Sequence, residues 1–283
     1  MLVHKIEDLK SLTKSWGNVK IALVPTMGAL HEGHLSLIKK AKESCEKVVV
    51  SVFVNPIQFG PSEDYDKYPR TLENDVKLCD SEGVDIVFAP SAEEMYGKNG
   101  RLSNDNLTYI CPPFFYVNKL CGKSRVGHFD GVCTVVLKLF NIVQPSVAYF
   151  GQKDAQQVVV IKKMVEDLNV PVEIFQAPIV REESGLALSS RNKYLSVEGK
   201  EQALVLSKIL NNIKSCYKKG VTDITALKET AYTFLNERHD MEYLEILDKN
   251  TLEEKLKADK DSIVLIACKV DGVRLIDNMY LED

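Results

Sequence analysis

One stretch decides the fold: residues 19–54 read VKIALVPTMGALHEGHLSLIKKAKESCEKVVVSVFV. Val19 to Pro25 is a short apolar run, and a turn that contains Gly28 follows it. The apolar residues that then recur at helical spacing are Leu35, Ile38, Ala41 and Cys45. Val48 to Val54 is rich in β-branched residues, as parallel strands buried on both faces are. The stretch therefore predicts a strand, a helix and a second, parallel strand.

The same alternation continues to about residue 180. Thr71 is expected to cap a helix that ends at Gly83, and Val84 to Phe88 is the next strand. The elements predicted after the unassigned residues 91–126 are a helix at 132–143, a strand at 147–150, a helix at 158–168 and a strand at 172–175. Such alternation predicts a Rossmann-like, doubly wound parallel sheet, whose ligands bind outside the carboxyl ends of the strands.

A different pattern follows in the last third of the chain. Helices are predicted at 197–218 and 223–238, and short strands at 243–247, 263–270 and 273–276. This order is typical of a smaller α+β domain. We therefore predict two domains, 1–179 with the parallel sheet and 180–283 as a lid, with residues 179–195 as the hinge or lid region.

Composition narrows the class of protein. The length of 283 residues fits about two domains. Lys and Arg number 36 against 40 Asp and Glu, a net charge of −4 that gives no support for a nucleic-acid partner. The seven cysteines are odd in number and form no C-x-x-C pair, as in reduced cytoplasmic proteins. No apolar run approaches the roughly 18 residues of a membrane span, so we expect a cytoplasmic protein with no membrane partner.

The first chemical motif is His31-Glu32-Gly33-His34, which opens the first predicted helix. Histidines three residues apart share one helix face, and the N–H groups of a helix N-terminus suit a phosphate. A lone histidine would be read as a turn residue, but two of the five histidines stand in this turn. Zinc is the weaker interpretation, because the metalloprotease spacing is H-E-x-x-H and no third ligand is evident. We predict a phosphate-binding turn and no protein metal site.

Two further segments follow predicted strands. Asn55 and Gln58 lie in FVNPIQFG, residues 53–60, where a doubly wound sheet binds its ligand. Lys153 could neutralise a phosphate, and Asp154 could cap the next helix. Taken singly, the first segment is also explained as a loop that Asn-Pro and Gly break, and the second as a capped helix with a solvent-exposed lysine.

Residues 189–192, Ser-Ser-Arg-Asn, lie in the hinge region and offer donors to a transferring phosphoryl group. A capping serine is the simpler alternative, and a serine nucleophile lacks its G-x-S-x-G elbow. Gly122-Lys123-Ser124 only resembles the end of a P-loop, because Val117 stands where the first glycine belongs. No G-x-G-x-x-G is present, so we expect no dinucleotide or other tightly bound organic cofactor.

Five motifs together resemble, in order along the chain, those of the pantoate:β-alanine ligase family. They are PTMGALHEGH at 25–34, FVNPIQFG at 53–60, GHFDGV at 127–132, GQKDAQQ at 151–157 and Ser-Ser-Arg-Asn at 189–192. The H-x-G-H turn also resembles the signature of the wider nucleotidyltransferase and class I aminoacyl-tRNA synthetase superfamily. The resemblance covers nearly the whole chain.

The resemblance implies an activity and its participants. The family condenses pantoate with β-alanine through a pantoyl adenylate, and releases AMP and pyrophosphate from ATP. It implies that residues 1–179 bind ATP and pantoate, and that residues 180–283 close over them. It further implies Mg²⁺ held mainly by phosphate oxygens and water, and a cytoplasmic homodimer.

The resemblance also assigns residues. Those implied to bind ATP are Met27, Gly28, Ala29, Leu30, His31, Glu32, Gly33, His34, Gly151, Gln152, Lys153, Asp154, Val180, Leu188, Ser189, Ser190 and Arg191. The implied catalytic residues are His34 as the general acid, His31 on the phosphates, Lys153, Ser189, Ser190 and Arg191. Gln58 and Gln157 would hold pantoate, with Gln58 also near β-alanine.

Three departures from the family pattern and two competing functions stand beside this interpretation. Leu188 replaces the usual Met, a swap that conserves volume, Val126 replaces a usual Pro, and residues 97–119 look unlike the common form. A nucleotidyltransferase that adenylylates a phosphate would need a phosphate pocket, whereas Gln58 and Gln157 are neutral. A non-catalytic ATP-binding regulator would have no need of a leaving-group acid such as His34.

Overall fold

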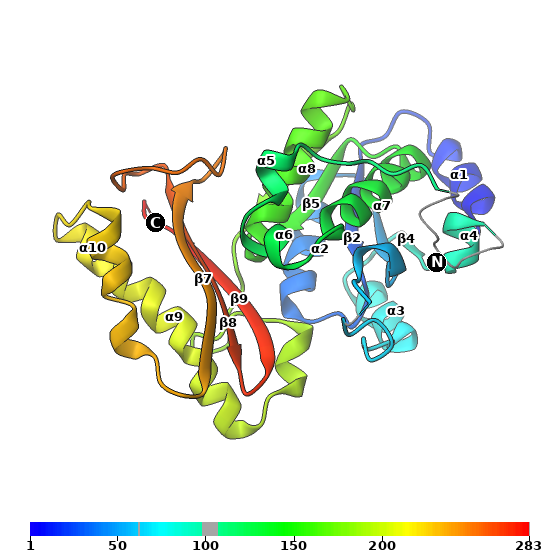
Figure 1. Ribbon diagram of the computed structural model, residues 1–283. Coiled ribbons are helices and arrows are strands. Elements are labelled where there is room, and N and C mark those ends of the chain that lie inside the picture. The colour runs from blue at the N-terminus through cyan, green and yellow to red at the C-terminus, as the bar shows by residue number, and fades with distance from the viewer. Residues whose placement is uncertain (62, 98–106, 283) are drawn as a thin grey trace. The chain divides into compact units, whose positions relative to one another are not determined.

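The computed structural model describes residues 1–61, 63–97 and 107–282. The chain forms two compact units (Figure 1): unit 1 comprises Met1–Gly151 and Val160–Ala177, and unit 2 comprises Gln152–Val159 and Pro178–Asp283. The domain boundary expected between residues 179 and 180 stays a prediction. Among the residues described, no helix has the length and apolar character to cross a membrane.

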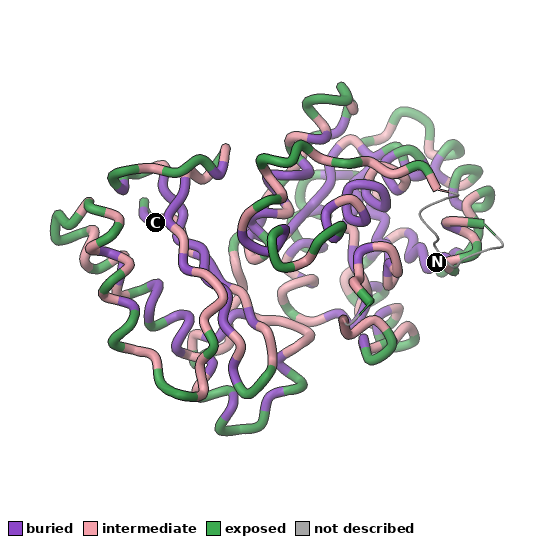
Figure 2. Tube along the Cα trace, viewed as in Figure 1, coloured by how far each residue is buried: buried purple, intermediate pink, exposed green. Residues whose placement is uncertain are grey.

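Unit 1 is built on a six-stranded parallel sheet, in the order β1-β4-β3-β2-β5-β6. Its strands are β1 (Leu2–Val3), β2 (Ile21–Thr26), β3 (Lys47–Val52), β4 (Ile86–Phe88), β5 (Val147–Gly151) and β6 (Glu173–Ala177). Ala22 to Val24 and Val48 to Val50 are 0% exposed, so the central strands are covered on both faces (Figure 2). The predicted parallel sheet is confirmed.

The helices of unit 1 alternate with the strands along the chain and cover the sheet. They are α1 (Ile6–Ser15), α2 (Glu32–Ser44), α3 (Leu72–Ser81), α4 (Ala92–Tyr96), α5 (Phe114–Val117), α6 (Leu120–Ser124) and α7 (His128–Val143). A further helix, α8 (Ala155–Asp167), begins among the residues of unit 2 and continues in unit 1. Leu35 and Ile38 of α2 are buried in one cluster with Ala22 and Val24 of β2, as their helical spacing predicts.

The strand order places a ligand-binding edge beside β2. From β2 the chain passes to β3 and β4 on one side, and β5 then pairs with β2 on the other side. In open α/β sheets, ligands bind outside the carboxyl ends of the strands where the order reverses in this way. The segments that leave those ends are residues 27–34 after β2 and residues 53–60 after β3.

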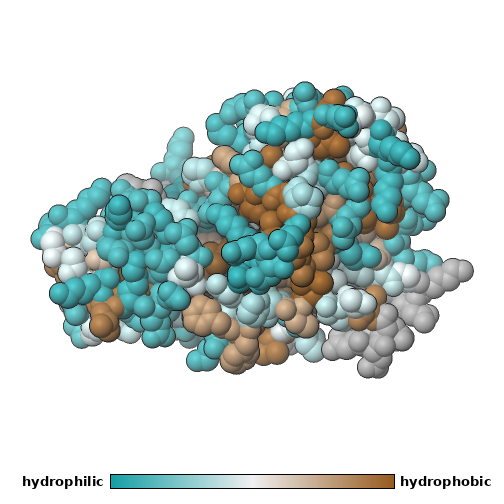
Figure 3. Space-filling view, turned by 90° about the horizontal axis from the view of Figure 1, so that it is seen from above, coloured by the Kyte–Doolittle hydropathy of each residue, from teal (hydrophilic) through white to brown (hydrophobic). Residues whose placement is uncertain are grey.

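One face of unit 1 carries apolar side chains, as Figure 3 shows within a mostly hydrophilic surface. Phe114 and Phe115 of α5 are 76% and 43% exposed. Large apolar side chains that are exposed together are typical of surfaces that another molecule covers.

Unit 2 pairs an antiparallel sheet with helices. The strands are β7 (His239–Asp248), β8 (Ser262–Val270) and β9 (Val273–Tyr280), and the helices are α9 (Val197–Lys218) and α10 (Ile224–Glu229). Leu206 and Ile209 of α9 are buried with Val264 and Ile266 of β8. Between β8 and β9, Asp271 and Gly272 have φ of +49° and +82°, the two positive values that a tight Asp-Gly hairpin turn requires. The α+β prediction for this part is confirmed.

Several predicted elements differ from those observed. The helix expected at 223–238 ends at Glu229 and is followed by a short 3₁₀ turn at Tyr232–Phe234. Asn236 then accepts a hydrogen bond from the Arg238 N–H at 3.0 Å, a local bond that competes with helix. Neither β1 nor α1 was predicted, although Ile6, Leu9 and Leu12 of α1 stand at helical spacing.

Two other expectations concern Thr71 and the segment 97–119. Thr71 stands at the N-cap position of α3 but makes no cap hydrogen bond, since its hydroxyl donates to the Asp75 carboxylate instead. Thr71 therefore occupies the expected N-cap position, but the expected cap hydrogen bond is absent. Of the unusual segment 97–119, residues 98–106 lie outside the described residues.

Candidate active site

Helix α2 begins with a reciprocal cap made by two histidines. His31 is the N-cap residue, and its Nδ1 accepts the Gly33 N–H at 3.1 Å. The His31 N–H donates in turn to Nδ1 of His34 at 3.3 Å, and the ring centroids lie 4.1 Å apart. Because both Nδ1 atoms accept, each neutral ring carries its proton on Nε2. The cap thus makes both rings Nε2–H donors at a helix N-terminus, where the helix dipole favours an anion.

The turn between β2 and α2 is held by a buried aspartate that the sequence analysis missed. Asp75 of α3 is 0% exposed and accepts the N–H groups of Ala29 at 3.0 Å and Leu30 at 2.8 Å. Gly28 has φ +80°, and a Cβ there would lie 2.9 Å from Asp75 Oδ2, so the turn requires glycine. An acidic residue in the first turn of a helix is ordinary, so no sequence signal marked Asp75.

Behind the 53–60 segment lies a chain of buried amides. The Tyr96 hydroxyl donates to Asn55 Oδ1 at 2.7 Å, and Asn55 Nδ2 donates to Gln58 Oε1 at 3.0 Å and to the Gly131 carbonyl at 3.1 Å. Asn55 is 1% exposed, so its amide has one orientation that satisfies these partners. That orientation leaves Gln58 Nε2 facing Met27 Sδ, 3.2 Å away. Gln58 therefore borders the turn that precedes α2.

A charged cluster fixes the backbone of Gln58. His128 Nδ1 lies 2.8 Å from the Gln58 carbonyl oxygen, and Arg125 Nη1 lies 2.9 Å from His128 Nε2. Arg125 also donates to both carboxylate oxygens of Glu63, at 2.8 and 2.6 Å. Burial raises the pKa of Glu63, but the hydrogen bond and charge of Arg125 outweigh it and hold that pKa below its ordinary value. Neither Arg125 nor Glu63 was singled out from the sequence.

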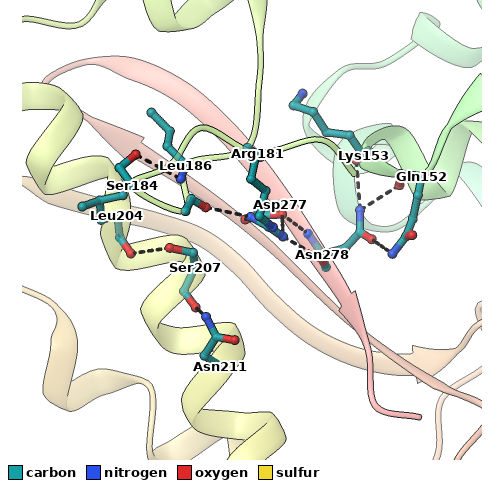
Figure 4. A network of polar contacts seen from close by, with 12 residues as sticks. Gln152, Lys153, Arg181, Ser184, Leu186, Leu204, Ser207, Asn211, Asp277 and Asn278 are labelled. Carbon is teal, nitrogen blue, oxygen red and sulfur yellow. Dashed lines mark hydrogen bonds and ion pairs between the residues drawn. The ribbon is translucent and has the colours of Figure 1, made fainter. Parts of the chain in front are cut away.

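In unit 2, the predicted ATP segment after β5 is bound to strand β9 (Figure 4). Asn278 Nδ2 donates to the carbonyl oxygens of Gln152 at 2.9 Å and Lys153 at 3.0 Å, and Gln152 Nε2 donates to Asn278 Oδ1 at 3.2 Å. Gln152 is buried, Lys153 is half-buried and Asp154 is exposed. A 3₁₀ turn at Gln152–Asp154 leads into α8, and the capping role expected of Asp154 stays a prediction.

The predicted segment 180–191 folds back on itself. The Leu188 N–H donates to the Val180 carbonyl at 3.0 Å, and Arg181 and Ala187 form an antiparallel bridge. The Ser189 hydroxyl accepts the Arg191 N–H at 3.3 Å and so caps the 3₁₀ turn Ser190–Tyr194. The capping alternative raised for this serine therefore holds, while the catalytic roles of the segment stay predictions.

The structure divides the predicted site residues between the units. Unit 1 brings Met27 to His34 together with Asn55 and Gln58 at the carboxyl ends of β2 and β3. The site residues of unit 2 are Gln152, Lys153, Asp154, Gln157, Val180, Leu188, Ser189, Ser190 and Arg191. Gly151 is the last residue of β5, in unit 1.

The fold and the unit 1 turn are typical of an α/β protein of the nucleotide-binding kind, because a helix N-terminus, where an anion is favoured, lies at the reversal of the strand order. The family model described as pantoate-beta-alanine ligase matches residues 1–280. The chain belongs to the pantoate–β-alanine ligase family.

Similar proteins agree with this assignment. The bifunctional pantoate ligase/cytidylate kinase of Trichormus variabilis is 48% identical over 277 residues, covering 97% of the chain and 52% of that protein, so the chain spans about half that relative's length. A pantothenate synthetase structure from Thermus thermophilus has a TM-score of 0.93 at 40% identity, covering 100% of this chain and 99% of the other. A pantoate-beta-alanine ligase from Francisella tularensis, complexed with beta-gamma ATP and β-alanine, has a TM-score of 0.78 at 37% identity and covers 100% and 98%.

Proposed function

We propose that this protein condenses pantoate with β-alanine to pantothenate through a pantoyl adenylate, converting ATP to AMP and pyrophosphate. The observation that carries the proposal lies in unit 1: Gln58 Nε2 is 3.2 Å from Met27 Sδ, so the proposed pantoate amide borders the proposed ATP turn. Membership of the family over residues 1–280 supports it. So does the similarity to the Francisella tularensis ligase, whose structure contains beta-gamma ATP and β-alanine.

In the first step, the pantoate carboxylate attacks the α-phosphorus of ATP and pyrophosphate leaves. Charge grows on the phosphate oxygens, and preorganised donors that meet it lower the barrier. His31 and His34 present Nε2–H groups for this purpose, because their Nδ1 atoms are occupied by the α2 cap. We assign His34 to the departing pyrophosphate as the general acid and His31 to the neighbouring phosphates.

The remaining donors belong to unit 2. Lys153 and Arg191 supply positive charge to the phosphates, and Ser189 and Ser190 supply hydroxyls. The other proposed ATP contacts are Met27, Gly28, Ala29, Leu30, Glu32, Gly33, Gly151, Gln152, Asp154, Val180 and Leu188.

Pantoate is held by neutral amides. Gln58 and Gln157 can bond its hydroxyl and carboxylate oxygens without adding charge beside the triphosphate. Asn55 occupies Gln58 Oε1 and leaves Nε2 toward Met27, so Gln58 would act as a donor to pantoate. In the second step the neutral amine of β-alanine, near Gln58, attacks the adenylate. That mixed anhydride must be kept from water, the task we assign to residues 180–283 as a lid.

ATP is accompanied by Mg²⁺ in this proposal. Mg²⁺ keeps several waters and is usually bound through substrate phosphates together with one or two carboxylates. Asp154, exposed within the proposed ATP segment, is a carboxylate of that kind. When bound, Mg²⁺ would neutralise phosphate charge. We propose no tightly bound organic cofactor.

We further propose a cytoplasmic homodimer. Phe114 and Phe115 support the dimer, since their exposure on α5 suits a surface that a second copy covers. The seven cysteines support the location, because all are free thiols, as in a reducing compartment. Light scattering should give twice the monomer mass, and Phe114→Asp should shift it toward the monomer.

One assay tests the function. Purified protein with ATP and Mg²⁺ should form AMP and pantothenate only when pantoate and β-alanine are both present. Exchange of label between pyrophosphate and ATP should require pantoate and Mg²⁺ but not β-alanine. Gln157→Ala should weaken that exchange, whereas Gln202→Ala, on α9 outside the proposed site, should not. Exchange that depends on β-alanine would contradict the adenylate.

A further inference from the structure

Two neighbouring residues of strand β9 each hold a different segment of the proposed phosphate site (Figure 4). Asp277 and Asn278 are 4% and 2% exposed, although both are polar. Successive side chains of a strand point to opposite faces of the sheet. Asp277 pairs with Ile266 of β8, which is buried in the same cluster as Leu206 and Ile209 of α9. Asp277 is therefore on the face of the sheet that α9 covers, and Asn278 is on the opposite face. One segment is held on each face.

Asn278 fixes the direction in which the Lys153 side chain leaves the backbone. The Gln152 and Lys153 carbonyls belong to the two peptide groups that flank the Lys153 Cα, and both accept from Asn278 Nδ2, at 2.9 and 3.0 Å. Planar peptide groups leave only φ and ψ free between them, so holding both planes sets the Cα–Cβ direction. In Figure 4 the Lys153 side chain extends away from Asn278.

The Asn278 amide is itself held in one orientation. Gln152 Nε2 donates to its Oδ1 at 3.2 Å, which distinguishes the oxygen from the nitrogen. The backbone N–H of Asn278 donates separately to Asp277 Oδ1 at 2.8 Å. The amide thus has a donor on one side and two acceptors on the other, and a flipped amide would face like groups on both.

Asp277 holds the second segment through Arg181. Nη1 and Nη2 of Arg181 donate to the two oxygens of the Asp277 carboxylate at 2.7 and 2.9 Å, a bidentate pair. Arg181 Nη1 also donates to the Gly185 carbonyl at 3.1 Å. Arg181 and Ala187 form the bridge of the folded segment, from which Leu188 to Arg191 follow. The ion pair therefore anchors the base of the Ser189–Arg191 segment to β9.

We propose that Asn278 and Asp277 are positioning residues that preassemble the phosphate-binding half of unit 2, Asn278 by aiming Lys153 and Asp277 by anchoring the segment that carries Arg191. The identity of the ligand rests on the function proposed above. Positioned charges act on a transition state only when they are in place before it forms. Neither residue needs to touch ATP to have this effect.

A double-mutant cycle separates aiming Lys153 from general stability. With enzyme in excess over ATP and with saturating pantoate, Asn278→Ala should slow pyrophosphate release about 10- to 100-fold, since a displacement near 1 Å can cost that much. In the Lys153→Ala background the same change should cost less than about threefold, because there is no ammonium left to aim. Equal losses in the two backgrounds would overturn the proposal.

Two further variants distinguish a local effect on Lys153 from a general loss of stability. Asn278→Asp keeps the side chain's size but turns a carboxylate oxygen toward two carbonyls, so it should slow the step at least as much as Asn278→Ala. Ser262→Ala on the neighbouring strand removes a buried hydroxyl whose hydrogen bonds are made with Asp259. It should lower the melting temperature and leave the rate within about twofold.

Amide hydrogen exchange decides the proposal without any turnover. Residues 150–158 should exchange faster in Asn278→Ala than in the wild type, and at the wild-type rate in Ser262→Ala. Unchanged exchange in Asn278→Ala would overturn the proposal whatever the kinetics. A wild-type protein that makes no pantothenate would instead refute the proposed function, and the exchange result would still decide the role of Asn278.

Discussion

Replacing Asp75 by Asn tests whether one buried carboxylate holds the turn that begins the proposed ATP site. The carboxylate accepts the N–H groups of Ala29 and Leu30 and the hydroxyl of Thr71. An amide has one oxygen, so its NH₂ would face one of the two backbone donors. The loss is one hydrogen bond to a charged group, worth about 1.5 to 3 kcal/mol, together with a buried donor left unsatisfied.

We therefore expect Asp75→Asn to lower the free energy of unfolding of unit 1 by about 2 to 4 kcal/mol. For a unit of this size, each kcal/mol moves the melting temperature by roughly 2 to 4 °C. Urea titration followed by tryptophan fluorescence measures the first quantity, because Trp16, the chain's one tryptophan, lies in unit 1. Asp80→Asn is the matched control, since Asp80 lies on the same helix and is exposed.

The same variant should also affect chemistry. A loosened turn no longer holds the start of α2, so label exchange between pyrophosphate and ATP should fall at temperatures where the variant is fully folded. An Asp75→Asn protein with the wild-type urea midpoint would refute the reasoning about the carboxylate. Reduced stability with unchanged pyrophosphate–ATP label exchange would show that the Asp75 carboxylate stabilises the fold and does not contribute to the chemistry.

Three other predictions concern unit 1. His34→Asn keeps an acceptor for the His31 N–H but lacks Nε2–H, so pyrophosphate release should slow about 10²- to 10⁴-fold with the melting temperature nearly unchanged; a normal rate would remove His34 from the mechanism. Tyr96→Phe leaves Asn55 Oδ1 without its donor, and KM for pantoate should rise about tenfold with little change in kcat. An unchanged KM would contradict the role of the Tyr96–Asn55–Gln58 hydrogen bonds in holding pantoate. Because Arg125 lowers the pKa of folded Glu63, the pair's stabilisation is present above the unfolded Glu pKa of about 4.3 and disappears as the pH falls through the folded pKa. The stability difference between wild type and Glu63→Gln should therefore be largest near pH 7 and shrink in acid, and a difference independent of pH would refute the assignment.

The parallel sheet was predictable because its signal is local and periodic. Val48 to Val50 are fully buried, and a run of β-branched residues is typical of a strand that is covered on both faces. The positions of the His31–His34 turn and of Gln58 followed, since segments after parallel strands gather at one edge of a sheet. Strand β1 has only two residues and leaves no such pattern.

The supports of the site were not predictable for the opposite reason. Asp75 bonds to backbone groups 45 and 46 residues away, and Asn278 bonds to carbonyls 125 and 126 residues away. A single side chain that bonds to distant backbone has no periodicity and no fixed spacing, so it resembles any other polar residue in its element. The end of the helix predicted at 223–238 has a different, local origin, because Asn236 bonds to the backbone two residues on and so competes with helix.

The histidine pair shows why this motif has its spacing. A reciprocal cap needs acceptors at the N-cap and at the third residue of the helix, and His31 and His34 occupy those positions in α2. Serine and glutamate, the usual pair, would satisfy the helix but would offer no further donor. An imidazole has two nitrogens, so Nδ1 can serve the backbone while Nε2–H serves a ligand. The three-residue spacing is thus set by helix geometry, and the choice of histidine over serine or glutamate is what the proposed chemistry adds.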